Sequence, residues 1–123
     1  MLANNFYTVQ SSDQVSETQI QYKIHINGAH PIFEGHFPEQ PVVPGVCMMQ
    51  TITELAGQSV QQELILQKAN TMKFVNMIDP RQQADVIVDL QWSQLEDQLL
   101  KVNATIKSDT ITFMKLQGVF ARK

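Results

Sequence analysis

GHFPEQPVVPG, residues 35–45, is the stretch of this sequence that carries the most structural information. Its three prolines, Pro38, Pro41 and Pro44, are spaced three residues apart. Proline fixes its own φ angle and pushes the residue before it toward extended backbone, so the segment is a stiff, non-regular loop. Such a loop holds the neighbouring His36 in one place. We therefore predict that this stretch is an active-site loop.

A long helix is predicted directly after the loop. Pro44 suits the first position of a helix, where no backbone N–H is needed. From there to about Gln67 the sequence has no further proline and only one glycine, Gly57. Apolar residues recur at helical spacing in two adjacent lines: Val46, Met49, Ala56, Val60 and Leu64 in one, and Met48, Ile52 and Leu55 in the other. A helix that is apolar on most sides of its first turns is typical of one that other structure surrounds.

The remaining sequence predicts strands. Residues 18–27 alternate apolar and polar side chains, as a half-buried strand does, and a shorter strand is expected around residues 6–9. Four more strands are expected after the helix, in an antiparallel meander: residues 72–78, 84–93, 99–107 and 111–121. One long helix and one sheet fit a small domain when the sheet curls around the helix. We therefore expect an α+β fold in a single domain, residues 1–123.

Composition narrows the class of function. The formal net charge of −3 argues against nucleic-acid binding, which needs a basic excess. No apolar run is long enough to span a bilayer, and the first residues lack the pattern of a signal peptide. The single cysteine, Cys47, excludes an internal disulfide framework and is interpreted as a buried small hydrophobe. No Cys/His cluster has zinc spacing. We expect a cytoplasmic protein with no membrane, nucleic-acid or metal partner.

The loop and the helix together resemble the hot-dog fold and, within it, the β-hydroxyacyl-acyl carrier protein dehydratases of fatty acid synthesis. The resemblance rests on His36-Phe37-Pro38, then Pro41, then Pro44-Gly45-Val46, with His30-Pro31-Ile32-Phe33-Glu34-Gly35 as the lead-in. It covers about residues 27–58 and continues more weakly at Met72-Lys73-Phe74. His-Phe-Pro alone carries little information, whereas the combined spacing into an amphipathic helix is specific.

The resemblance implies a role for several residues. Dehydration of a 3-hydroxyacyl thioester needs a base for the proton beside the carbonyl, donors for the carbonyl oxygen and an acid for the departing hydroxyl. By resemblance, His36 is the base, and the backbone N–H of Gly45, at a helix N-terminus, polarises the carbonyl. The substrate-binding residues that it implies are Phe37, Pro44, Val46 and Met49.

The resemblance also implies partners. The substrate is an acyl thioester of acyl carrier protein or of coenzyme A, in fatty acid or related lipid or polyene biosynthesis, and no cofactor is implied. Family members are dimers whose acid comes from the partner's helix. We therefore expect a homodimer or a higher even oligomer, in which edge strands of two sheets join.

The sequence departs from the family at the acid. Five residues after the glycine of Pro-Gly the family carries Glu or Asp, and this chain has Gln50, which cannot give up a proton. Four residues on, on the same helix face, the family usually carries Gln and this chain has Glu54. An extra helical turn would instead align Glu54 and Gln58 with the family's Glu-x-x-x-Gln. We prefer the ungapped alignment, because an inserted turn would rotate the buried helix.

Three interpretations stay open. Glu54, acting through a water held by Gln50, serves as the acid of a slower dehydratase. Alternatively, the chain has lost the acid and catalyses other thioester chemistry, such as hydrolysis. In the third, it is an acyl-binding or partner subunit of a fatty-acid-type synthase. The first interpretation predicts that Glu54→Gln costs far more activity than Gln50→Ala.

Overall fold

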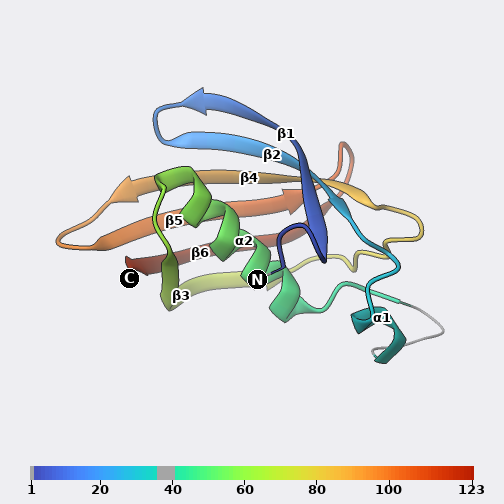
Figure 1. Ribbon diagram of the computed structural model, residues 1–123. Helices are drawn as coiled ribbons and strands as arrows, with labels where there is room; N and C mark the ends of the chain where they lie inside the picture. Colours follow the sequence, from blue (N-terminus) through green and yellow to red (C-terminus); the bar gives the residue numbers. More distant parts are fainter. Residues whose placement is uncertain (1, 36–40) are drawn as a thin grey trace.

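Figure 1 shows the computed structural model, which describes residues 2–35 and 41–123. Within these ranges, six antiparallel strands form one sheet in the order β1-β2-β4-β5-β6-β3, curled around the long helix α2. This confirms the α+β architecture that the sequence predicts. The elements are β1 (Tyr7–Ser16), β2 (Gln19–Ile26), α1 (Ile32–Gly35), α2 (Gly45–Val60), β3 (Leu64–Phe74), β4 (Asp85–Gln94), β5 (Leu99–Lys107) and β6 (Thr112–Arg122).

Alternating side chains of the strands build the core. In β2, Ile20, Tyr22, Ile24 and Ile26 are buried, whereas the residues between them are more exposed. The same alternation runs along β5. These buried side chains belong to one apolar cluster with the inner face of α2. The strands predicted for the second, fourth, fifth and sixth positions are therefore confirmed, each to within about a residue at either end.

Helix α2 is buried on one side only. It begins after Pro44, whose φ of −63° and ψ of 145° make it the N-cap residue and not the first helical residue. The buried residues of the helix are Cys47, Met48, Thr51, Ile52, Leu55, Ala56 and Gly57. Of the two predicted apolar lines, the one through Met48, Ile52 and Leu55 is fully buried, whereas Val46 is 69% exposed. One side of the helix is thus available for a site.

The helix ends at Val60, earlier than the predicted end near Gln67. The prediction was wrong because Val60 and Leu64 are four residues apart, as neighbours on a helix face are. In the structure Leu64 is instead the first residue of β3 and buries its side chain there. Periodicity alone therefore could not locate the end of the helix.

A backbone turn at Gly57 ends the helix. Gln61 adopts the left-handed conformation, with φ of 58°, and the N–H of Gln62 donates to the carbonyl of Gly57 at 3.0 Å. A Cβ at Gly57 would lie 2.9 Å from the carbonyl oxygen of Gln62. Glycine at this position therefore lets the chain fold back over the last helical turn.

Strand β3 differs from its prediction in place and in partner. It begins at Leu64, not at residue 72, and it pairs with β6 and not with β4. Only β4, β5 and β6 therefore form the predicted meander. The close β3–β6 pairing requires Gly118, since a Cβ there would lie 2.8 Å from the carbonyl oxygen of Lys68. Strand β1 is also longer than predicted, running to Ser16.

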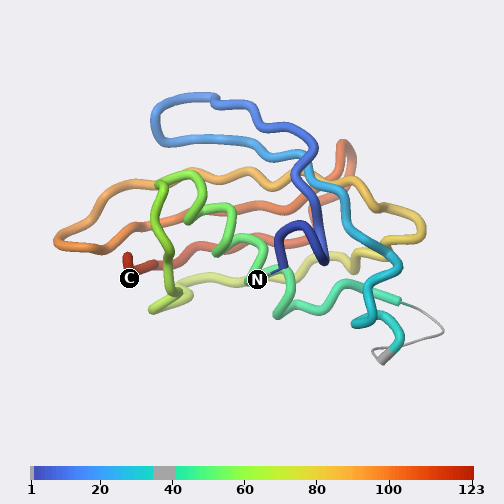
Figure 2. Tube along the Cα trace, in the orientation of Figure 1, coloured from blue at the N-terminus to red at the C-terminus, as the bar shows by residue number. Residues whose placement is uncertain are grey.

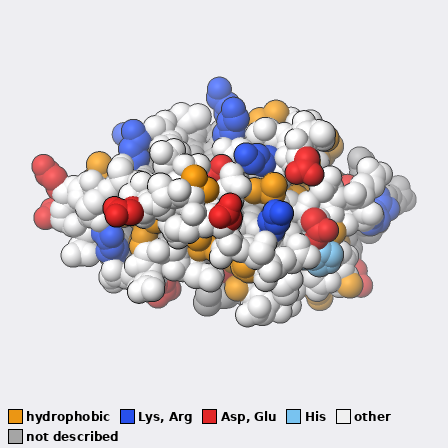
Figure 3. All heavy atoms as spheres, turned by 90° about the horizontal axis from the view of Figure 1, so that it is seen from above, with side chains coloured by type: hydrophobic (Ala, Val, Ile, Leu, Met, Phe, Trp, Pro, Cys, Tyr) orange, Lys and Arg blue, Asp and Glu red, His pale blue; other side chains and the backbone are white. Residues whose placement is uncertain are grey.

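The two edges of the sheet differ in character. The β1 edge carries the polar run QSSDQ at residues 10–14, whereas the β3 edge and the segment after it expose the apolar side chains of Ile65, Met72, Phe74, Val75 and Met77. Seen from above, charges of both signs are interspersed with single hydrophobic side chains (Figure 3). Figure 2 shows the N-terminal segment passing beside α2 and the C-terminus lying near the start of β3, where the N–H of Lys123 bonds to the carbonyl of Glu63.

Candidate functional site

The structure describes the residues that precede and follow the predicted active-site loop. His36 and Phe37, the expected base and one expected substrate contact, lie outside the described residues. Before them, Phe33 in α1 is buried in the core. After them, Val43 is buried and its N–H donates to the carbonyl of Ile78 at 2.8 Å. Both flanks of the loop are thus fixed to the core beside the start of α2.

The start of α2 presents backbone N–H groups that no described side chain caps. Such groups favour a carbonyl oxygen or an anion. Pro44, Gly45 and Val46, three of the predicted residues, line a cavity of about 610 Å³ together with Phe74 and Met77. A Cβ at Gly45 would lie 2.9 Å from the ring of Phe74, so glycine allows this close packing at the helix start.

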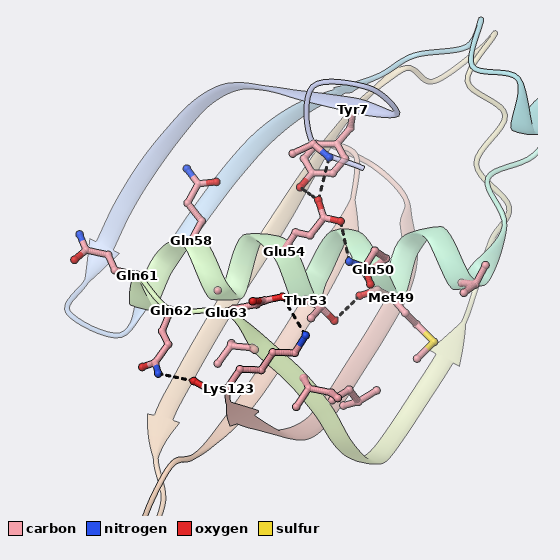
Figure 4. Close-up of a pocket in the computed structure, with 16 residues that line it drawn as sticks. Tyr7, Met49, Gln50, Thr53, Glu54, Gln58, Gln61, Gln62, Glu63 and Lys123 are labelled. Atoms are coloured by element: carbon pink, nitrogen blue, oxygen red, sulfur yellow. Dashed lines mark hydrogen bonds and ion pairs between the residues drawn. The ribbon is translucent and has the colours of Figure 1, made fainter. Parts of the chain in front are cut away.

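A larger cavity, of about 880 Å³, runs along the exposed side of α2 toward β3. The structure brings together four predicted residues in its wall: Val46, Met49, Gln50 and Glu54 (Figure 4). The rest of the wall combines the apolar side chains of residues 64–66 and Ala3 with Gly57 and with polar and charged side chains: Tyr7, Thr53, Gln58, Gln61, Gln62, Glu63 and Lys123. A wall that combines apolar and polar side chains suits a ligand that has an apolar chain and a polar head.

The carboxylate of Glu54 is the most heavily bonded group in this cavity. It accepts hydrogen bonds from the N–H groups of Leu2 at 2.9 Å and Ala3 at 3.0 Å, from the Tyr7 phenol at 3.1 Å and from Gln50 Nε2 at 2.8 Å. In Figure 4 Glu54 points away from the helix toward Tyr7, and Gln50 points toward Glu54. Four donors, three from residues 2–7 and one from α2, thus converge on one side chain.

These donors set the protonation state of Glu54. Burial by itself raises the pKa of a carboxyl, but the hydrogen bonds from Leu2, Gln50, Ala3 and Tyr7 outweigh it, so the pKa of Glu54 is lowered. Burial, and then the Glu54 carboxylate, raise the pKa of the Tyr7 phenol far above its usual value. At neutral pH, Glu54 is therefore a carboxylate and Tyr7 a neutral donor.

This geometry bears on the idea of a relay from Glu54 to Gln50 through a water. The two side chains bond directly, at 2.8 Å, which leaves no space for a bridging water between these atoms. A group that stays ionised at neutral pH also has no proton to donate. The arrangement favours a structural or positioning role for Glu54.

Sequence reasoning missed the N-terminal residues of this site. Leu2 and Ala3 contribute through backbone N–H groups, which nearly every residue type has, so the sequence does not reveal this role. Tyr7 is the first residue of β1, whose other residues are exposed, yet it is itself 1% exposed. A buried tyrosine needs a partner for its hydroxyl, so the burial of Tyr7 is the signal that could have pointed to a polar group on the facing helix.

Other predicted features are as follows. Cys47 is buried, as expected, and burial raises the pKa of its thiol, which disfavours a nucleophilic role. His30 Nδ1 accepts the N–H of Ile32 at 3.1 Å, so His30 orients the start of α1.

The described part of the chain holds no group of three or more residues that could bind a metal ion. None of its helices is both long and apolar enough to cross a bilayer.

Comparison with known proteins places these features in a family. The family model described as "ApeI dehydratase", of the ApeI-like family, matches residues 12–114. The chain is 30% identical over 87 residues to a 3-hydroxyacyl-[acyl-carrier-protein] dehydratase FabZ of Rickettsia bellii, covering 64% of this chain and 59% of that protein. It is 28% identical over 105 residues to the FabZ of Ruminiclostridium cellulolyticum, covering 76% and 74%. The chain thus spans less than two thirds of the first relative's length.

Solved structures show the same fold. The dehydratase heterocomplex ApeI:P from Xenorhabdus doucetiae matches with a TM-score of 0.73 at 18% identity, over 93% of this chain and 96% of that one. An uncharacterized protein from Erwinia carotovora subsp. atroseptica matches with a TM-score of 0.63 at 21% identity, over 93% and 90%. At these identities the likeness concerns the fold, in which a sheet curls around one helix.

Proposed function

Because the chain belongs to the ApeI-like dehydratase family, we propose that it takes part in the dehydration of 3-hydroxyacyl thioesters carried by acyl carrier protein. The observation that carries this proposal is the uncapped start of α2 at Gly45. It opens onto a cavity at the end of the loop that contains His36. A helix N-terminus in this place suits a thioester carbonyl oxygen.

The proposed reaction divides its tasks among these residues. His36 removes a proton from the carbon next to the thioester carbonyl, and those electrons form the new C=C bond as the C–O bond to the hydroxyl breaks. The N–H of Gly45 stabilises the negative charge that develops on the carbonyl oxygen. The hydroxyl receives a proton and leaves as water. The residues proposed to contact the substrate are Phe37, Pro44, Val46 and Met49.

The source of that proton defines a second candidate function. Gln50 has no proton to give, and the four donors on Glu54 hold it as a carboxylate. This favours a chain that is a slow dehydratase alone and a complete one with a partner that supplies a carboxylic acid. The Xenorhabdus doucetiae structure is a dehydratase heterocomplex. We propose the same kind of assembly as the alternative to a self-sufficient homodimer.

The edge strand β3 is the proposed assembly surface. Its outer side carries backbone groups without a neighbouring strand among the described residues, and it exposes Ile65, Met72 and Phe74. An open edge with apolar side chains invites pairing with another strand, whereas the polar β1 edge does not. Both cavities border β3 or the segment that follows it. A second chain on this edge would therefore lie next to both.

One experiment tests these functions together. The purified chain is incubated with 3-hydroxyacyl-acyl carrier protein of several chain lengths, and the enoyl product and free thiol are both measured. Enoyl product without free thiol is expected. Free thiol without enoyl product would support a thioesterase instead, and binding without either product would support a partner subunit. The same incubation with the coenzyme A thioester tests the choice of carrier.

A further inference from the structure

We propose that Tyr7 is a positioning residue which, through Glu54, fixes the side-chain amide of Gln50 so that its carbonyl oxygen serves as an acceptor in the larger cavity. The ligand group that this acceptor fits is a hydroxyl, either the 3-hydroxyl of the acyl chain or a water. The inference rests on the proposed function, and it adds that the acyl chain of a thioester bound at the start of α2 extends past Val46, which lines both cavities, into the larger one.

The first step is the rigidity of the N-terminal turn, residues 2–7. The N–H groups of Asn5 and Phe6 bond to the carbonyl of Leu2 at 3.1 and 2.8 Å, and the N–H of Asn4 bonds to the carbonyl of Tyr7 at 2.7 Å. Asn4 adopts the left-handed conformation, with φ of 65°, which asparagine tolerates well. Phe6 and Tyr7 are each 1% exposed. The turn is thus closed by its own bonds and anchored in the core.

The second step concerns the hydrogen bonds that this turn donates to Glu54. The N–H groups of Leu2 and Ala3 reach the two carboxylate oxygens separately, Oε2 at 2.9 Å and Oε1 at 3.0 Å, and the Tyr7 hydroxyl reaches Oε1 at 3.1 Å. These three bonds come from one rigid segment. They fix the plane of the carboxylate as well as its position.

The third step follows from the chemistry of an amide next to a carboxylate. A carboxylate only accepts hydrogen bonds, so the group of Gln50 that lies 2.8 Å from Glu54 Oε2 must be the Nε2 donor. The other end of the amide, Oε1, is then left as an acceptor on a side chain that lines the cavity. The turn thus fixes which end of the Gln50 amide is free to accept a hydrogen bond.

The same turn also contacts the approach to the active-site loop. The ring of Phe6 stacks on Phe33 of α1, with ring centroids 5.8 Å apart, and meets His30 edge-on at 5.6 Å. Phe6 and Tyr7 are adjacent in sequence, so one short segment contacts both α1, through Phe6, and Glu54, through Tyr7. A displacement of the turn would disturb both at once.

The test compares Tyr7→Phe with Tyr22→Phe. Tyr22 is a matched control, because it is also buried and its hydroxyl bonds at 2.8 Å to a different residue of α2, Ser59. The readouts are the pH titration of the Glu54 side-chain carboxyl by ¹³C NMR and the ¹H–¹⁵N signals of the Gln50 side-chain amide. The other charged side chains that line the cavity, Glu63 and Lys123, pair with each other at 3.0 Å, and neither substitution removes a partner of this pair.

Tyr7→Phe removes one donor from Glu54. We expect the titration midpoint of Glu54 to move upward and the Gln50 amide signals to shift, while Tyr22→Phe leaves both unchanged. Where the protein turns over substrate, kcat should fall about tenfold with little change in KM, since a misplaced group impairs the reacting geometry. Unchanged Glu54 and Gln50 signals in Tyr7→Phe would overturn the proposal.

Two further outcomes are distinguishable. The NMR readout needs no turnover. If Tyr7→Phe shows the expected signal changes but the wild-type protein forms no product, the proposed function is wrong and the positioning role of Tyr7 is still supported. If Tyr7→Phe fails to fold, Glu54→Gln is measured in its place. The proposal then requires the Gln50 amide signals to move, and it is wrong if they keep their wild-type positions.

Discussion

Gln50 donates its side-chain amide to Glu54 across one turn of α2, with 2.8 Å between Nε2 and Oε2. In the ungapped alignment preferred above, Gln50 falls at the position of the family's acid, and Glu54 is the alternative source of a proton. The bond uses the donor of the first and one acceptor of the second. The bond therefore leaves the Gln50 side chain fixed against the Glu54 carboxylate.

Replacement of the proposed base is the most direct test of the loop. We expect His36→Ala to lower thioester turnover on the order of 10²–10⁴-fold, because a positioned base contributes that much. The fold should survive, since the prolines around it, and not the imidazole, restrict the loop. Product formation and the circular dichroism spectrum are measured on the same sample. Full activity in a folded variant would contradict the assignment.

Restoring the family's acid should raise dehydration. In Gln50→Glu the introduced carboxyl lies beside the Glu54 carboxylate, and a like charge at this distance raises the pKa of the introduced group. A carboxyl that stays protonated nearer neutral pH is a better proton donor. We expect at least about a tenfold gain in enoyl product over wild type.

The matched control is Gln50→Ala, which removes the amide without adding an acid. Glu54→Gln tests the remaining possibility, that Glu54 is the acid. If Glu54 were itself the acid, this change would cost far more activity than Gln50→Ala does. The lowered pKa of Glu54 predicts the opposite order, or losses of similar size.

The sequence was sufficient to predict the start of α2 and four of the six strands, because local periodicity and proline placement determine them. It was insufficient for the end of α2, since the αL turn at Gln61 depends on how the backbone folds over Gly57. It was also insufficient for the role of Glu54. Two of the donors to Glu54 are backbone N–H groups about fifty residues away, and no side-chain pattern encodes them.

The N-terminal turn should loosen at low pH. The pKa of Glu54 is lowered in the folded protein, so its bonds contribute stability that is present above the unfolded value near 4.3 and is lost as the pH falls through the folded value. We expect the amide hydrogens of Leu2 and Ala3 to lose protection from exchange as the pH falls below the unfolded-state pKa of a glutamate. NMR-detected exchange at a series of pH values measures this.

Glu54→Gln is the comparison for the pH experiment. It has no titrating group at this position, so its protection should not change over the same pH window. Parallel loss of protection in wild type and Glu54→Gln would mean that another group controls the turn.

The two edges of the sheet should respond differently to a charge. Ile65→Lys on β3 places an ammonium group on the proposed pairing edge, and we expect it to shift the oligomer toward monomer. Val15→Lys on β1 is the control, since Val15 is similarly exposed, at 53% against 50%. Light scattering gives the particle mass of each. A wild-type particle of only 14.0 kDa at micromolar concentration would refute the dimer.

Mixing two variants can show whether one active site is shared between chains. The double variant His36→Ala/Gln50→Glu carries a potential acid and no base, whereas the wild type carries a base and no acid. If each site takes its base from one chain and its acid from the partner's helix, a mixed dimer contains one complete site. We therefore expect the mixture to form enoyl product faster than the sum of the two proteins measured separately.

The controls define how this result is interpreted. A mixture of wild type with the single variant His36→Ala introduces no acid and should give no gain. If the mixture with the double variant also gave none, while the single variant Gln50→Glu was active, base and acid would act within one chain. Both residues would then have to reach the same cavity from the same end of α2. That result would leave the β3 edge as an assembly surface without a part in catalysis.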